Sequence, residues 1–292
     1  LTGDTFDDAY AAAQSFKNET NSMFVHPFED KDVVIGQATL ALELIEQAEE
    51  PIDYILVPIG GGGLISGVLH VFKTLSPQTK VIGIEPEGAP AMQQSLSNGK
   101  NMELNEIDPF VDGAAVRKVG DDAFTLCKTY LDKLVLVSEG KICQSILKLY
   151  NKEAIVVEPA GAMSTASLKM ITDEIKGKNV VCLICGGNND ITRMAEIKER
   201  ALLEANLLHY FIVRFPQRAG ALKEFVAEVL GPKDDITFFE YSKKNNRSNG
   251  PAVVGIEIKN PNDFDSLVKR MKSKGFYGDY INNKPDLFQF LI

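Results

Sequence analysis

Apolar positions along the first two thirds of the chain follow two alternating periods. Near-continuous apolar runs rich in β-branched residues predict buried strands at Tyr54 to Ile59, Val81 to Glu85, Leu134 to Ser138 and Val180 to Cys185. Apolar residues at helical spacing predict helices before, between and after them, around Phe6 to Phe16, Val34 to Glu49, Leu64 to Phe72, Asp121 to Leu131, Gly140 to Tyr150, Met163 to Ile175 and Arg193 to Asn206. This alternation predicts an α/β fold with a parallel sheet covered by helices on both faces.

The pattern changes near Leu203. Strands are expected at Leu208 to Phe215, Ile236 to Tyr241, Val253 to Ile258 and Leu287 to Ile292, and helices at Gly220 to Leu230 and Phe264 to Lys274. The order βαββαβ is that of a ferredoxin-like module. We therefore expect two domains, 1–203 and 204–292, with a polar hairpin loop at Lys243 to Gly250 in the second.

Four consecutive glycines, Gly60, Gly61, Gly62 and Gly63, join the first strand to a helix that starts near Leu64. Glycines let the backbone approach a ligand closely, and a helix start offers unpaired N–H groups, so this turn predicts a phosphate site. It is not a P-loop, because the loop lacks the Lys-Ser/Thr pair of that motif.

Two other interpretations of the glycine turn stay open. In a dinucleotide-binding loop, Glu85 would bind a ribose, but the third glycine of GxGxxG is missing, since Ile65 and Ser66 stand where it is needed. In a tight turn without ligand, one or two glycines would suffice. Ligands of parallel sheets lie at the carboxyl ends of the strands, so the glycine loop, Glu85, Ser138 and Cys185 are expected to line one crevice.

Composition narrows the class of partner. Hydrophobic residues make up 45% of the chain and charged residues 24%, which is typical of globular proteins. A formal net charge of -9 argues against nucleic acid and anionic membranes as partners. No apolar stretch is long enough to span a membrane and no signal sequence is seen, so the cytoplasm is expected. The Cys182-x-x-Cys185 pair has no second pair of ligands, which argues against a metal or redox site.

Four motifs together resemble the biosynthetic threonine deaminase (threonine ammonia-lyase) family. They are Gly-Gly-Gly-Gly-Leu at 60–64, Glu-Pro-Ala-Gly-Ala at 158–162, Cys-Gly-Gly-Asn at 185–188 and Phe-Pro-Gln-Arg-Ala-Gly-Ala-Leu at 215–222. The likeness covers essentially the whole chain. It implies a fold-type II pyridoxal-phosphate enzyme with a C-terminal ACT-like regulatory domain.

The resemblance also implies roles for single residues. Gly60 to Leu64 would bind the phosphate of pyridoxal 5'-phosphate through backbone N–H groups, and Cys185 would face the pyridine nitrogen. Glu158, in the expected loop at Glu158 to Ala162, is the remaining candidate for the same pocket. From the residues alone, Glu158 could also be a surface-loop carboxylate and Cys185 a buried small apolar residue. The implied reaction converts L-threonine to 2-oxobutanoate and ammonia, the first step of isoleucine biosynthesis.

The chain departs from the family in one respect that matters for catalysis. The family's Schiff-base lysine lies in a Ser-Phe/Tyr-Lys-x-Arg-Gly motif, which is absent here. Ser15-Phe16-Lys17 is followed by Asn18-Glu19 instead, so Lys17 is expected to be a solvated lysine of the first helix, which Asp4 would cap. We therefore expect an N-terminally truncated enzyme that has no catalytic residue of its own and is inactive alone.

Regulation is implied as well. The resemblance suggests isoleucine as inhibitor and valine as its antagonist, bound at a turn that includes Pro216, Arg218 and Gly220. An exposed sheet edge in the tail predicts a homo-oligomer. Two other classes of function remain: a non-catalytic amino-acid-binding regulatory module, and a nucleotide-binding α/β protein.

Overall fold

The chain forms two compact units, Leu1–Arg193 and Met194–Ile292, in a computed structural model that describes residues 2–3, 6–241 and 249–292. The division falls before α9 (Met194–Glu204), whereas the sequence pattern placed a domain boundary at its end. The expected cap at Asp4 and most of the expected loop at Lys243 to Gly250 lie outside the described residues.

The sheet of the first unit is parallel and has the order β3-β2-β1-β4. Its strands are β1 (Tyr54–Pro58), β2 (Lys80–Pro86), β3 (Lys133–Val137) and β4 (Val180–Cys182). In the register, Tyr54 pairs with both Lys80 and Val180, so β1 lies between β2 and β4. The loops that follow β1 and β4 therefore leave the same edge of the sheet side by side.

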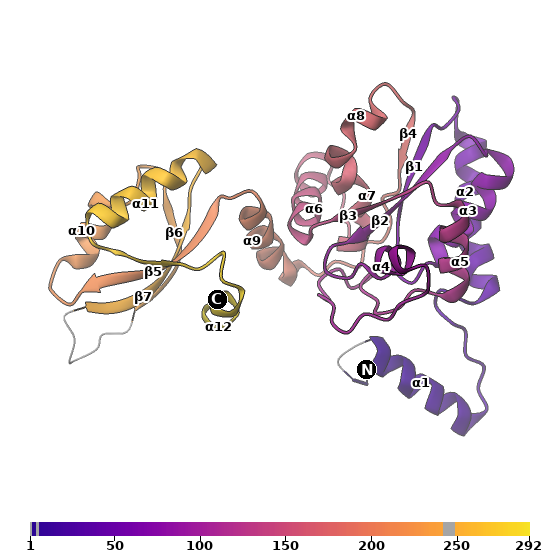
Figure 1. Cartoon of the computed structure of the whole chain (residues 1–292), viewed down its shortest axis with the longest axis horizontal. Helices are drawn as coiled ribbons and strands as arrows, with labels where there is room; N and C mark the ends of the chain where they lie inside the picture. The colour runs from indigo at the N-terminus through magenta and orange to yellow at the C-terminus, as the bar shows by residue number, and fades with distance from the viewer. Residues whose placement is uncertain (1, 4–5, 242–248) are drawn as a thin grey trace. The chain divides into compact units, whose positions relative to one another are not determined.

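Helices cover both faces of this sheet, as the sequence pattern predicts. Figure 1 shows α2 (Lys31–Gln47), α3 (Gly63–Leu75) and α5 (Asp121–Tyr130) on one side, and α6 (Glu139–Glu153), α7 (Pro159–Ser167) and α8 (Thr172–Ile175) on the other. Ile55, Val57 and Phe72 are fully buried in the core between the sheet and α3. An amphipathic helix α1 (Phe6–Thr20) precedes these elements.

Two details of the first unit differ from the sequence prediction. Residues Glu158 to Ala162 were expected to be a loop, but α7 begins at Pro159 with Glu158 as its N-cap residue. Proline suits the first helical position because its missing N–H has no acceptor there. The helix α4 (Ala91–Asn98) was not predicted, since it is short and largely polar.

The second unit has an antiparallel sheet with the order β6-β7-β5-β8, the ferredoxin-like arrangement that the tail predicts. Its strands are β5 (Leu208–Pro216), β6 (Asp235–Tyr241), β7 (Asn249–Glu257) and β8 (Tyr277–Tyr280). The helices α10 (Ala221–Glu228) and α11 (Phe264–Ser273) connect them. Phe211, Phe225 and Phe276 lie in a separate core, so this unit buries its own apolar surface.

The predicted last strand, Leu287 to Ile292, is wrong. That segment lies in α12 (Pro285–Leu291), and the fourth strand is β8, which lies earlier in the chain. The chain turns back at Gly275, which has a φ of 77°, and Pro285 then opens a helix. Among the described helices none is long and apolar enough to cross a bilayer.

Candidate functional site

A pocket of about 370 Å³ lies at the carboxyl ends of β1 and β4. All seven residues that the sequence assigned to a cofactor site line it: Gly60, Gly61, Gly62, Gly63, Leu64, Glu158 and Cys185. Neighbouring parallel strands bring these segments together, although Leu64 and Glu158 are far apart in the sequence. The structure thus joins the glycine loop and Cys185 in one pocket.

The glycine loop supplies backbone donors. The Ser66 N–H donates to the Gly62 carbonyl at 3.0 Å, and the preceding N–H groups of Gly63, Leu64 and Ile65 have no acceptor one turn earlier within α3. Gly62 has a φ of 103°, a left-handed conformation that favours glycine. A helix start with free N–H groups and a positive dipole end suits a phosphate.

Packing explains why two of these positions are glycine. A β-carbon on Gly60 would lie 2.8 Å from the Ala114 Cα atom, and one on Gly61 would lie 2.3 Å from the Phe28 ring. Neighbouring elements therefore exclude side chains here whether or not a ligand binds. The consequence is a loop whose bare backbone borders the pocket.

Cys185 and Glu158 form the other end of the site. Burial first, and then the nearby Glu158 carboxylate, raise the pKa of the Cys185 thiol, so the thiol stays protonated and uncharged at neutral pH. The Glu158 Oε2 atom accepts a hydrogen bond from the Asn188 N–H at 3.1 Å. The Glu158 N–H donates to the Gly186 carbonyl, also at 3.1 Å. These two bonds hold the segment after β4 against the start of α7.

Several residues that line the pocket were not indicated by the sequence. Phe28 and the segment 112–114 border the pocket, and the Arg193 guanidinium holds that segment by donating to the Phe110 carbonyl at 2.7 Å and to the Asp112 carboxylate at 3.2 Å. Neither segment matches a cofactor motif. Only the Asp-Gly dipeptide at 112–113, which marks a turn, could have drawn attention to this loop.

Glu85 and Ser138, which were expected in the crevice, do not line this pocket. Glu85 is 1% exposed, and its carboxylate accepts hydrogen bonds from the N–H groups of Met92 at 2.7 Å and Gln93 at 2.8 Å. It caps α4 and is not available to a ribose. Ser138 is the N-cap residue of α6. Lys17 lies exposed on α1, in agreement with its expected place as a solvated helix lysine.

Burial raises the pKa of both thiols of the Cys-x-x-Cys pair. Burial raises the pKa of the Cys182 thiol to about 11, which disfavours the thiolate that metals and redox chemistry need. Within the part of the chain that the structure describes, no three His, Cys, Asp or Glu side chains are grouped to hold a metal ion.

The predicted effector turn lies between β5 and α10. The Arg218 N–H donates to the Pro216 carbonyl at 2.8 Å, and the Arg218 guanidinium forms an ion pair with Glu224. Gly220 has a φ of 83° and is the N-cap residue of α10, without a side-chain cap. Two hollows of this unit lie away from the turn: one is lined by Asn206, Tyr280 and Phe288, the other by Lys198, Tyr210 and Glu257.

The residues of the pocket fit pyridoxal phosphate. Free N–H groups at one end suit a phosphate dianion, and an uncharged thiol at the other end suits an aromatic nitrogen that carries no proton. Because Gly60 to Gly63 carry no side chains, nothing of their own covers the backbone N–H groups that border the pocket.

Comparison with protein families and curated proteins agrees with this fit. The family described as "Pyridoxal-phosphate dependent enzyme" matches residues 1–186, and the "C-terminal regulatory domain of Threonine dehydratase" matches residues 199–291. Over 292 residues, all of this chain, the biosynthetic L-threonine dehydratase IlvA of Halalkalibacterium halodurans is 56% identical and that of Bacillus subtilis 54%. The chain covers 70% and 69% of the lengths of these two relatives.

Solved structures show the same likeness. The processed form of threonine deaminase isoform 2 from Solanum lycopersicum matches with a TM-score of 0.66 and 36% identity, over 70% of this chain and 56% of that one. The serine racemase from Dictyostelium discoideum matches with a TM-score of 0.57 and 32% identity, over 65% of this chain and 61% of that one. The chain thus spans less than two thirds of each of these two solved relatives.

Proposed function

The chain belongs to the threonine dehydratase family of pyridoxal-phosphate-dependent enzymes, and we propose that it carries the phosphate and pyridine sites of a threonine ammonia-lyase together with its regulatory domain. The observation that carries this proposal is the meeting of the glycine loop and Cys185 at one pocket. The glycine loop alone, or Cys185 alone, would be compatible with other folds and ligands.

The glycine loop is proposed to hold the cofactor phosphate. The N–H groups at the start of α3 would donate to its oxygens, and the dipole of α3 would favour its negative charge. Since the loop lacks lysine and arginine, these donors are all from the backbone. Removing the phosphate from the ligand should therefore remove most of its affinity for this end of the pocket.

Cys185 is proposed to face the pyridine nitrogen. Bound pyridoxal phosphate supplies an electron sink for the negative charge that develops at the substrate Cα atom. The buried, uncharged Cys185 thiol offers the ring nitrogen a weak hydrogen bond and no proton. A neutral group in this position favours loss of the β-hydroxyl group of threonine over transamination, as the family resemblance implies.

Activity should depend on residues that this sequence does not contain. None of its lysines stands in the family's Ser-Phe/Tyr-Lys-x-Arg-Gly motif, so we expect the 292 residues alone to form no 2-oxobutanoate from threonine. A fusion that adds a segment with the family's lysine motif ahead of this chain should be active. Product formation by the purified 292 residues, or an inactive fusion that still binds pyridoxal phosphate, would contradict the proposal.

The second unit is proposed to bind an amino-acid effector. The family name of residues 199–291 supports a regulatory role, and the resemblance points to isoleucine as inhibitor and valine as its antagonist. The proposed site is the turn Pro216 to Gly220, where the first N–H groups of α10 have no side-chain cap and could bind a carboxylate.

The same unit is proposed to pair with a second copy. Strand β6 is at the edge of its sheet and pairs only with β7 among the described strands. Exposed apolar residues lie on this strand and on α10: Phe239, Tyr241, Leu222 and Val226. An exposed edge with apolar side chains is a common pairing surface. If the unit bound isoleucine but the chain bound no pyridoxal phosphate, the alternative of a non-catalytic amino-acid sensor would be favoured.

A further inference from the structure

The start of α5 packs directly behind the glycine loop. The Gly120 N–H donates to the Gly61 carbonyl at 2.9 Å. A β-carbon on Gly62 would lie 2.3 Å from the Ala123 Cβ atom in the first turn of α5. The position of the loop therefore depends on where α5 begins.

The contact with Gly120 also sets the direction of a donor. No peptide bond is cis in the part of the chain that the structure describes, so the carbonyl of Gly61 and the N–H of Gly62 point in opposite directions across their shared peptide plane. Because the Gly61 carbonyl points to Gly120, the Gly62 N–H points away from α5. Rotation of this peptide would exchange a donor for an acceptor beside the pocket.

A residue from a distant segment caps α5. Gly120 is the N-cap residue of α5 and has no side chain with which to cap the helix. Instead, the Glu29 Oε1 atom accepts a hydrogen bond from the Asp121 N–H at 2.8 Å, across 92 positions of sequence. The Glu29 side chain packs against Gly120, where an added β-carbon would be 2.8 Å from the Glu29 Cγ atom.

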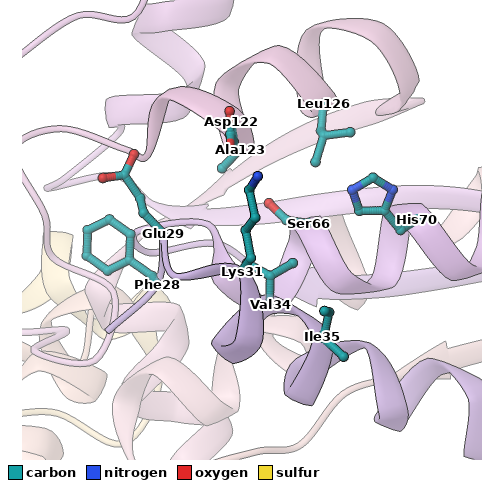
Figure 2. A pocket seen from close by; sticks show the side chains of 10 residues that line it. All are labelled: Phe28, Glu29, Lys31, Val34, Ile35, Ser66, His70, Asp122, Ala123 and Leu126. Carbon is teal, nitrogen blue, oxygen red and sulfur yellow. The ribbon is translucent and has the colours of Figure 1, made fainter. Parts of the chain in front are cut away.

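Glu29 is itself held in place. Its N–H donates to the Nδ1 atom of His26 at 3.1 Å, and its Oε2 atom lies 3.5 Å from the Nε2 atom of the same ring. The preceding residue, Phe28, covers Gly61. Figure 2 shows Phe28 and Glu29 together at one end of a second hollow of about 280 Å³, with Asp122 and Ala123 of α5 beside it.

We propose that Glu29 is a positioning residue for the phosphate site: by capping α5 it fixes Gly120, and Gly120 holds the Gly61–Gly62 peptide with its N–H free for a phosphate. This inference rests on the proposed function of the glycine loop. Glu29 itself does not line the pocket that the loop borders, so it acts through the backbone of α5.

The first test compares ligands with and without phosphate. Pyridoxine 5'-phosphate has no aldehyde and cannot react with surface lysines, and pyridoxine lacks the phosphate as well. Affinities of the 292-residue chain for both are measured by calorimetry. Glu29→Ala should weaken binding of the phosphate ester about fivefold, the factor that corresponds to the ~1 kcal/mol typical of a lost helix cap. Binding of pyridoxine should not change.

Two variants serve as controls. Glu29→Gln keeps an oxygen that can accept from the Asp121 N–H, so it should bind the phosphate ester nearly as well as the wild type. Glu43→Ala removes an exposed carboxylate from α2 and should have no effect on either ligand. Equal weakening for both ligands in Glu29→Ala would indicate general destabilisation and overturn the proposal.

A double-mutant cycle tests the contact itself. Gly120 has a φ of -59°, which any residue adopts, and the three atoms nearest to an added β-carbon all belong to Glu29. Gly120→Ala should therefore displace Glu29 and weaken binding of the phosphate ester about as much as Glu29→Ala. Glu29→Ala with Gly120→Ala should be no weaker than Glu29→Ala alone. Additive losses would overturn the proposal.

Amide hydrogen exchange supplies a readout that needs no ligand. In Glu29→Ala, the Asp121 amide should exchange faster, and the Gly120 amide should exchange faster as well, because its bond to Gly61 loosens. If the Gly120 amide in Glu29→Ala exchanges as slowly as in the wild type, Glu29 caps α5 without positioning Gly120, and the proposal is overturned. If the wild type binds both ligands equally, the proposed phosphate site fails, and exchange at Gly120 alone decides the role of Glu29.

Discussion

The carbonyl oxygen of Cys185 lies 1.5 Å from the point that a β-carbon on Gly161 would occupy. The first turn of α7 therefore packs against the backbone that presents Cys185 to the pocket. Only glycine allows this approach, because a backbone carbonyl cannot rotate away as a flexible side chain can. The glycine in the Glu-Pro-Ala-Gly-Ala motif thus supports the site without lining it.

Gly161→Ala should destabilise the first unit by about 3 kcal/mol, the upper part of the usual range for overpacking. Urea unfolding measures the free energy of unfolding. Gly187→Ala is the matched control, since an added β-carbon there meets only the Val156 oxygen at 3.7 Å, and it should change stability by less than about 0.5 kcal/mol. Similar values for the two variants would contradict the close packing of α7 on Cys185.

Gly61→Val should weaken binding of pyridoxine 5'-phosphate, because the added side chain meets the Phe28 ring and displaces the loop. Gly62→Val should have at least as large an effect, since a φ of 103° costs a β-branched residue on the order of 1–3 kcal/mol. Binding is measured by equilibrium dialysis. The control is Gly36→Val in α2, where nothing lies within 4 Å of an added β-carbon; unchanged retention in both loop variants would argue against the phosphate assignment.

Cys185→Ala should slow elimination without unfolding the protein. In the active fusion, the loss of one hydrogen bond to the ring nitrogen corresponds to roughly a tenfold lower kcat. Cys185→Ser keeps a neutral hydrogen-bonding group and should retain most of the activity. Circular dichroism of the same samples gives the folded fraction, and turnover is expressed per folded molecule. A purely structural Cys185 would change the melting temperature and leave turnover per folded molecule at the wild-type value.

Glu85 should make stability depend on pH. Burial, only partly offset by the bonds from Met92 and Gln93, raises its pKa from 4.5 to about 7. The folded state then holds the proton more tightly than the unfolded state. The contribution of Glu85 to the free energy of unfolding is therefore largest below pH 4.5 and falls as the pH rises to about 7. The whole change is on the order of 3 kcal/mol.

Glu85→Gln isolates this effect because glutamine does not titrate. The difference in free energy of unfolding, wild type minus variant, should fall between pH 4.5 and pH 7 and then stay constant. Urea unfolding at several pH values measures it. A difference that is flat over this range, or that rises with pH, would show that the folded state does not raise the pKa of Glu85.

The isolated residues 194–292 should self-associate and respond to isoleucine. Sedimentation velocity measures association, and calorimetry measures the melting temperature, which should rise with isoleucine occupancy. Leu222→Lys with Val226→Lys should abolish association by placing charges on the exposed face of α10. Valine and threonine are compared in the same experiment. No thermal response to any of the three would leave this unit as an assembly element without an amino-acid site.

The sequence by itself determined the class of fold and the two ends of the pocket. The spacing of apolar residues and the content of β-branched residues place the four parallel strands to within a few residues, because buried strands must be almost wholly apolar. The strand ends then place Gly60 to Leu64 and Cys185 at one edge of the sheet. Two of the errors, at Glu158 to Ala162 and Leu287 to Ile292, fall where a proline opens a helix within a short apolar segment.

Only the tertiary structure decided which residues support that site. Nothing in the local sequence indicates that Phe28 covers Gly61, that Glu29 caps α5, or that Glu85 caps α4. These are contacts between separate segments of the chain, and their energy depends on distance and burial, which periodicity does not encode. Local patterns determine which elements form, whereas the packing of those elements determines which side chains meet.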